Sequence, residues 1–351
     1  MEVSRDNADV RLPPAVDVPA VIPVSEAVPW REIPALGLVE PQLRQVGDVI
    51  RHSLTPRSAA QEMTPLFGHL LGRSGKMLRA ATVLLAGRCF GPLTQPHLRA
   101  AALMEMIHQA TLLHDDVIDD GHQRRGLPTV NRLWGNESAV LLGDFVLSHV
   151  FRMAAEFDAA TIAIIAQTAV RVCQGELRQA LQRGNWRLSE AEYFDIITEK
   201  SAAFFSGCCR LGGLLAHANT DAVEALARFG LSAGIAFQIA DDLLDITGEE
   251  GKTGKTVQRD LGRDKLTLAA IHLLRTLDAS TRAQVYATLE SADSSTGKLT
   301  DLLVQHGSLR YAQAQATHYV VRAIEALEGL PPSPGKDALI EMARFMADRA
   351  A

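Results

Sequence analysis

Two acidic motifs with the same spacing constrain this 351-residue chain more than any other feature. Each has the form Asp-Asp-x-x-Asp and follows an apolar, helix-like run. The carboxylates are those of Asp115, Asp116, Asp119, Asp241, Asp242 and Asp245. Residues four apart lie on one face of a helix, so the outer two aspartates of each motif point the same way. Carboxylates crowded beside an apolar run are unfavourable unless a cation neutralises them, so both motifs are predicted to bind cations.

Magnesium is the cation that this pattern favours. Mg²⁺ takes oxygen ligands and is usually held by one or two carboxylates together with substrate phosphates. Two such motifs facing each other would bind one diphosphate through bridging Mg²⁺ ions. One acidic motif alone would ordinarily be a solvated helix face, but two copies beside apolar helices favour the metal site.

Composition and periodicity predict an all-α fold. Aromatic residues make up only 5% of the chain, whereas Ala and Leu are abundant, which favours helices over sheets. From Leu38 onward the apolar residues follow a helical period, and no linker divides this part. The stretch 201–216, SAAFFSGCCRLGGLLA, is rich in small residues that let helices pack closely. We therefore expect one domain over residues 35–351, a helical bundle around a central cavity.

The expected helices leave one long loop after the first acidic motif. We expect a helix that ends at Gly72 and helices over 38–54, 77–90, 96–119, 138–155, 158–184, 189–216, 220–247, 264–276, 279–292, 298–305, 308–328 and 334–349. Residues 120–136 carry glycines and a proline and are expected to form a loop without a β-hairpin.

The other regions limit the alternatives. Residues 1–34 hold six prolines and are expected to form a disordered tail, because proline at that density blocks helix formation. The net charge of -6 gives no indication of nucleic-acid binding. We expect no membrane span and no signal peptide, since apolar runs are short and the first residues are acidic. The four cysteines are expected to be reduced, buried thiols of a cytoplasmic protein.

A diphosphate site also needs basic residues. Lys76 and Arg79 lie where a helix is expected to begin, a position that favours phosphate binding. Arg124 and Arg125 follow the first motif, and two adjacent arginines can reach different phosphate groups. Further candidates are His108, Lys200, Lys255 and Lys265. Their joint pattern predicts a site for two diphosphates.

With these motifs the chain resembles the trans-isoprenyl diphosphate synthases, also called polyprenyl synthetases. The resemblance covers residues 40–350 and rests on GKMLR (75–79), EMIHQATLLHDDVIDD (105–120), RRGLPT (124–129), EKSAAFFS (199–206), FQIADDLLDITG (237–248), GKTVQRDL (254–261) and KLTL (265–268). It implies an isoprenoid-synthase-type bundle, a homodimer, and Mg²⁺-dependent, head-to-tail elongation of an allylic diphosphate with isopentenyl diphosphate.

The resemblance also implies roles for single residues. Contacts to isopentenyl diphosphate are implied for Lys76, Arg79, His108 and Arg125. Contacts to the allylic diphosphate are implied for Arg124, Lys200, Ser201, Gln238, Lys255 and Lys265. The six aspartates match the metal-binding motifs and, with Arg124 and Lys200, the catalytic set. The chain departs from the family at Met77, where arginine is usual, and at Ala269, where proline is usual.

In the implied reaction the allylic C–O bond breaks and the isopentenyl double bond attacks the carbocation. Metal ions and basic residues carry the negative charge that develops on the diphosphate. The departing diphosphate takes the proton, so no protein base is assigned. Apolar helices around the site exclude water, which would quench the cation.

Product length is expected to depend on the wall beneath the first motif. Ala110 and Thr111 are small at positions where short-chain synthases often carry aromatic residues, while Ile107 and Met104 could form a floor deeper down. The small pair predicts an open channel and a product longer than farnesyl, although small residues also serve helix packing.

Three other functions are weighed against this one. A class I terpene cyclase normally has Asn, Ser or Thr and Glu in its second motif and needs no second diphosphate site. A head-to-head synthase would show D-x-x-x-D spacing. A non-catalytic subunit of a heteromeric synthase tends to lose acidic-motif residues, whereas this chain keeps all six.

Overall fold

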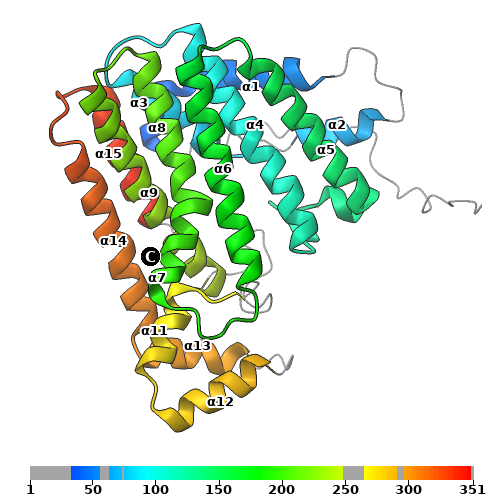
Figure 1. Cartoon of the computed structure of the whole chain (residues 1–351), viewed down its shortest axis with the longest axis vertical. Helices are drawn as coiled ribbons and strands as arrows, with labels where there is room; N and C mark the ends of the chain where they lie inside the picture. Colours follow the sequence, from blue (N-terminus) through cyan, green and yellow to red (C-terminus); the bar gives the residue numbers. More distant parts are fainter. Residues whose placement is uncertain (1–32, 56–62, 73–74, 248–264, 291–295, 349–351) are drawn as a thin grey trace, which may run out of the picture.

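Long helices running side by side make up most of the molecule (Figure 1). The computed structural model describes residues 33–55, 63–72, 75–247, 265–290 and 296–348. Helices α12 and α13 form a smaller group at one end of the bundle (Figure 1). The prediction of an all-α bundle is confirmed.

The elements follow one another with short connections. The helices are η2 (Pro34–Val39), α1 (Glu40–Leu54), α2 (Thr64–Leu71), α3 (Leu78–Arg88), α4 (Gln95–Ile118), α5 (Val130–Ala154), α6 (Ala159–Leu181), α7 (Glu190–Ile197), η4 (Thr198–Ala202), α8 (Ala203–Leu215), α9 (Thr220–Thr247), α11 (Leu268–Thr276), α12 (Ala279–Glu290), α13 (Thr296–Gln305), α14 (Ser308–Ala326) and α15 (Pro334–Asp348). The two strands are β1 (Gln123–Arg124) and β2 (Leu127–Pro128).

Helix α9 lies in the core of the bundle. It packs against α14 and α8, α8 packs against α3, and α3 leads through α4 to α5. A Cβ atom on Gly212 of α8 would lie 2.3 Å from the carbonyl oxygen of Val83 in α3. Because no larger residue fits there, the small residues of 201–216 allow the close packing that we predicted.

Helix α9 is also, within the described residues, the one helix long and apolar enough to cross a membrane. In its most apolar stretch 67% of the residues are buried inside the protein. Such burial is what the core helix of a folded bundle requires, so the length and apolar character of α9 follow from its central position.

The segment after the first acidic motif differs from the prediction. Strands β1 and β2 pair antiparallel, with Arg124 opposite Leu127, and α5 already begins at Val130. Gly135, with a φ of 86°, kinks α5 near its start. The glycines and proline of this segment thus mark a hairpin and a kink. The expected loop over 120–136 is therefore wrong from residue 130, as is the expectation of no hairpin.

The helix expected over 189–216 is divided. A π-helical turn, η4, separates α7 from α8 and carries Lys200 and Ser201. Helix α6 comes so close to this turn that a Cβ on Gly175 would lie 2.2 Å from the backbone nitrogen of Lys200. π-helical turns are frequent at functional sites.

The tail expected over residues 1–34 falls outside the described residues except for its last two. Of these, Ile33 is 1% exposed and Pro34 begins η2, which packs against α15 and α3. Cys89, Cys208 and Cys209 are buried, free thiols. Cys173 is exposed on α6, which corrects the expectation that all four thiols are buried.

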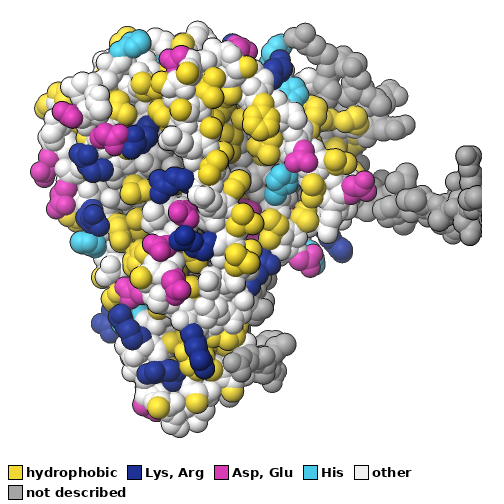
Figure 2. Space-filling view, viewed as in Figure 1, with side chains coloured by type: hydrophobic (Ala, Val, Ile, Leu, Met, Phe, Trp, Pro, Cys, Tyr) yellow, Lys and Arg dark blue, Asp and Glu magenta, His cyan; other side chains and the backbone are white. Residues whose placement is uncertain are grey.

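One face of the molecule is apolar where α5 and α6 lie. Figure 2 shows hydrophobic side chains gathered over these two helices. The exposed residues are Val140, Leu141 and Phe151 of α5 and Ile162, Val170, Leu177 and Leu181 of α6. We call this set the α5–α6 apolar face.

Replacing Gly175 by alanine is expected to destabilise the protein by about 1–3 kcal/mol, because the new Cβ meets backbone atoms that cannot move alone. Gly68 in α2 has open space around its Cβ position, so Gly68→Ala is expected to be neutral or slightly stabilising. Denaturant unfolding followed by circular dichroism measures both. Equal stability of the two variants would contradict the close approach of α6 to η4.

Candidate active site

The first acidic motif lies at the C-terminal end of α4. Asp119 follows the last helical residue, and its N–H donates to the carbonyl oxygen of Asp115 at 2.8 Å. The carboxylate of Asp116 is buried, and Oδ1 lies 2.9 Å from both Nε and Nη2 of Arg124. Because Arg124 stands in β1, the hairpin is what places its guanidinium against the motif.

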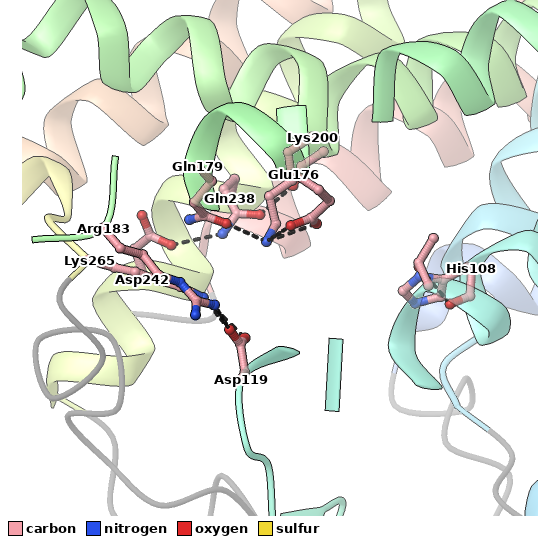
Figure 3. Close-up of polar contacts among 11 residues, drawn as sticks. His108, Asp119, Glu176, Gln179, Arg183, Lys200, Gln238, Asp242 and Lys265 are labelled. Carbon is pink, nitrogen blue, oxygen red and sulfur yellow. Dashed lines mark hydrogen bonds and ion pairs between the residues drawn. The ribbon is translucent and has the colours of Figure 1, made fainter. Parts of the chain in front are cut away.

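Asp119 is held by two cations from distant parts of the chain. Nη2 of Arg183 lies 2.6 Å from Oδ1, and Nζ of Lys265 lies 3.0 and 3.1 Å from the two carboxylate oxygens (Figure 3). Arg183 also donates to the carbonyl oxygen of Ile118, the last residue of α4, at 3.3 Å. The end of α4 is therefore tied to α6 and to the segment that leads into α11.

Lys200 lies between α6 and the first motif. Its Nζ donates to Glu176 at 3.0 Å and to Gln179 at 2.6 Å, both on α6 (Figure 3). Burial lowers the pKa of Lys200, but the carboxylates of Glu176, Asp115 and Asp119 raise it above its ordinary value. The ammonium group therefore stays charged at neutral pH.

The carboxylate of Asp115 is short of positive charge. Burial and the charge of Glu176 raise the pKa of Asp115 to about 7, against the opposing effect of Lys200 and Arg124. A hard cation beside Asp115 would remove this cost, so the residues present fit a divalent metal ion. In the part of the chain that the structure describes, no three His, Cys, Asp or Glu side chains form a group able to hold a metal. That arrangement suits an ion that also uses phosphate oxygens.

The second motif occupies the last turns of α9. Oδ1 of Asp242 accepts from Nε2 of Gln238 at 2.8 Å, and Oδ2 accepts from the hydroxyl of Tyr193 at 2.6 Å. The hydroxyl of Ser201 donates to Oε1 of Gln238. Both oxygens of Asp242 are thus held by side chains from α7 and α9. The other two aspartates of the motif, Asp241 and Asp245, are partly buried.

A pocket borders both motifs. It encloses ≈ 490 Å³, open solvent included, between α6, α7, α9 and the start of α11. Lys200, Gln238, Asp242 and Lys265 are among its lining residues. Since Lys265 lines the pocket beside Asp242 and also bonds Asp119, the two acidic motifs face one space.

Arg79, at the start of α3, lies in an aromatic cage. Its guanidinium carbon lies 5.9, 4.8 and 5.4 Å from the ring centroids of Phe204, Phe205 and Phe237. Burial lowers the pKa of Arg79, whereas the buried carboxylate of Glu105 raises it. Its Nε is buried with no hydrogen-bond partner. A guanidinium with an unused donor is suited to a phosphate ligand.

His108 and Arg125 lie in the electrostatic environment of Arg79. Burial, followed by the charges of Arg79, Arg125 and Arg124, lowers the pKa of His108 well below its ordinary value, so the ring is neutral. The guanidinium of Arg125 packs over Gly75. Figure 3 shows His108 on α4, apart from the group around Asp119 and Lys200.

Two predicted substrate contacts lie elsewhere. Nζ of Lys76 lies 5.4 Å from the ring centroid of Phe345 on α15. Met77, with a φ of 47°, separates Lys76 from the first residue of α3. Lys255 lies outside the described residues.

The predicted chain-length wall is part of the core. Ala110 and Met104 are fully buried, and Ile107 is nearly so. The hydroxyl of Thr111 donates to the carbonyl oxygen of His108 on the same helix at 2.9 Å.

Four residues of this region were missed by sequence reasoning. They are Tyr193, Glu176, Gln179 and Arg183. The spacing of Glu176 and Gln179 places them on one helix face, which was the available signal. Tyr193 and Arg183 gave no comparable signal, because an aromatic residue on a helix and an arginine in a turn have many ordinary roles.

The polyprenyl synthetase family model matches residues 60–305 of the chain. The chain belongs to the polyprenyl synthetase family. It is therefore a prenyltransferase that elongates prenyl diphosphates, and the predicted family is confirmed.

Individual members of the polyprenyl synthetase family are similar over most of their length. The short chain isoprenyl diphosphate synthase of Methanothermobacter thermautotrophicus is 32% identical over 80% of this chain and 88% of its own. The octaprenyl diphosphate synthase of Haemophilus influenzae is 32% identical over 89% of this chain and 95% of its own. A polyprenyl synthase of Caulobacter crescentus, solved with calcium and isoprenyl diphosphate, superposes with a TM-score of 0.84 at 30% identity, covering 90% of this chain and 97% of that one.

Replacing Asp115 by asparagine is expected to stabilise the metal-free enzyme at alkaline pH. The folded pKa of about 7 lies above the ordinary value of 3.8, so the wild type loses stability as the pH rises between these values. The advantage of Asp115→Asn in melting temperature should therefore grow by about 5 °C from pH 5 to pH 8, measured with EDTA present. Asp120→Asn is the control, since its side chain is 88% exposed. A pH-independent difference would contradict the assigned environment of Asp115.

Proposed function

We propose that this enzyme joins isopentenyl diphosphate head-to-tail to an allylic prenyl diphosphate in a Mg²⁺-dependent reaction, and that its products are medium to long chains. The observation that carries the proposal is the pair of acidic motifs on one pocket, linked by Lys265. Cations line the same space, as the transfer of a diphosphate leaving group requires. The calcium and isoprenyl diphosphate in the Caulobacter crescentus structure support the same type of site.

Each part of the site has a role in this proposal. Asp115, Asp119 and Asp242, with the remaining aspartates of the two motifs, would hold Mg²⁺. When bound, Mg²⁺ neutralises the charge that develops on the diphosphate as the allylic C–O bond breaks. The ammonium groups of Lys200 and Lys265 bind the same diphosphate and fix its orientation.

The second substrate belongs near α3. Arg79 and Arg125 would bind the diphosphate of isopentenyl diphosphate, and neutral His108 would donate one N–H to it. The isopentenyl double bond then attacks the allylic carbocation, and the departing diphosphate takes the proton. The aromatic rings around Arg79 exclude water from this space.

Incubation of the purified protein with Mg²⁺, isopentenyl diphosphate and labelled farnesyl diphosphate is expected to give elongated prenyl diphosphates. Excess EDTA should abolish the reaction. Chromatography of the dephosphorylated products measures both. Hydrocarbon products would indicate a terpene cyclase, and activity only after a second protein is added would indicate a heteromeric subunit. Either result would contradict the proposal.

Product length is proposed from the wall of α4, because similarity does not decide it. Relatives of equal identity include a short-chain synthase and an octaprenyl diphosphate synthase. Ala110 and Thr111 are small, and they precede Asp115 by about one helical turn. We infer that the growing chain extends past them toward Ile107 and Met104, beyond the length of farnesyl.

Replacing Ala110 by phenylalanine is expected to shorten the main product, because the ring fills the path of the growing chain. Thr111→Phe tests the neighbouring position and is less exposed to overpacking, since Thr111 is only partly buried. Product distributions from the labelled assay report the outcome, with melting temperatures as a check of folding. Wild-type products from both folded variants would remove these residues from the wall.

We further propose that two copies pair through the α5–α6 apolar face, in agreement with the resemblance to homodimeric synthases. Leu181 is 84% exposed and Phe151 is 72% exposed, and large apolar patches of this kind mark protein interfaces. A second copy would bury this face through a symmetric contact.

Leu141→Glu combined with Val170→Glu is expected to convert the dimer to a monomer, since it places charge in the buried contact. Val304→Glu is the control, because Val304 is comparably exposed on α13 but lies outside the face. Light scattering should give twice the chain mass of 38.0 kDa for the wild type and the control, and 38.0 kDa for the double variant. A monomeric wild type would contradict the proposal.

We place the enzyme in the cytoplasm. Its four free cysteines, one of them exposed, suit a reducing compartment.

A further inference from the structure

Tyr193 is a buried tyrosine whose hydroxyl reaches the site. It belongs to α7, which begins at a capping box formed by Ser189 and Glu192. The residue is 3% exposed, and its hydroxyl lies 2.6 Å from Oδ2 of Asp242. A phenol buried in a helical bundle needs a partner for its O–H group, and here the partner is a carboxylate of the second acidic motif.

This bond completes the fixation of Asp242. Gln238 donates to the other carboxylate oxygen at 2.8 Å. The amide of Gln238 is oriented in turn by Ser201, whose hydroxyl donates to its oxygen. A carboxylate held at both oxygens has one orientation, and hydrogen bonds to charged acceptors are the stronger kind.

The location of Tyr193 distinguishes it from a residue that only packs. Tyr193 lines the same pocket as Asp242, Lys200 and Lys265. Its ring also packs edge-on against Phe194, with centroids 5.7 Å apart. A phenylalanine would keep that packing, so the hydroxyl is needed only for the contact with the carboxylate.

We propose that Tyr193 is a positioning residue for prenyl transfer, which holds the Asp242 carboxylate in the orientation that serves the diphosphate and its metal ion. The inference rests on the proposed function of the pocket. Tyr193 acts through Asp242 on the allylic side of the site. It makes no contribution on the isopentenyl side around Arg79.

Tyr193→Phe tests this role with a single oxygen atom removed. We expect kcat to fall by roughly ten- to a hundredfold, because a hydrogen bond to a charged group is lost. The KM for isopentenyl diphosphate should change by less than about twofold, since that substrate binds elsewhere. Calorimetric titration of Mg²⁺ in the presence of inorganic pyrophosphate should show an affinity about tenfold weaker, independently of turnover.

Tyr311→Phe is the matched control. Tyr311 donates a hydroxyl–carboxylate hydrogen bond to Glu190, which also belongs to α7, but it does not line the pocket. This variant removes the same chemical group from a contact with the same helix. It should keep wild-type kcat and wild-type Mg²⁺ affinity.

A double-variant cycle separates positioning from stability. In the background of Asp242→Asn, adding Tyr193→Phe should cause little further loss of Mg²⁺ and pyrophosphate affinity, because the two residues act as one unit. Full additivity would overturn the inference, as would wild-type affinity in Tyr193→Phe or an equal loss in Tyr311→Phe. A wild-type protein that elongates no substrate would instead contradict the proposed function, so the two failures are distinguishable.

Discussion

Carboxylates placed at the end of an apolar helical bundle must be neutralised, and the architecture of this site follows from that requirement. Asp116 pairs with Arg124 of the hairpin, while Asp119 pairs with Arg183 and Lys265. Asp115 is the exception. The protein's own cations leave its pKa raised to about 7, which is the electrostatic reason to expect a further cation there.

Helix packing converts this local requirement into a shared pocket. Helices α4 and α9 both end near the segment that carries Lys265, so their acidic ends border one space. Gly175 lets α6 approach η4, and the π turn then holds Lys200 against Glu176. A bundle of larger residues could not bring these elements so close. The small residues of the core therefore serve the site as well as stability.

Much of this arrangement could be predicted from the sequence, because it depends on short-range patterns. Repeated aspartate spacing, apolar periodicity and clustered basic residues predicted the bundle and the family. The partners of Asp242 and Asp119 could not be predicted, since Tyr193 and Arg183 reach them from α7 and from the turn after α6. The hairpin was missed because the same glycines and proline that form it also occur in irregular loops. The π turn was missed because its sequence continues a helical pattern.

The central claim is that both acidic motifs bind one diphosphate through metal ions between them. It is tested most directly by a crystal structure of the enzyme with Mn²⁺ and inorganic pyrophosphate, with anomalous scattering used to place the metal. The account predicts metal ions in contact with Asp115 or Asp119 on one side and with Asp242 on the other, all bound to the same pyrophosphate. Metal and pyrophosphate bound to one motif alone, with the other facing solvent or a protein cation, would contradict it.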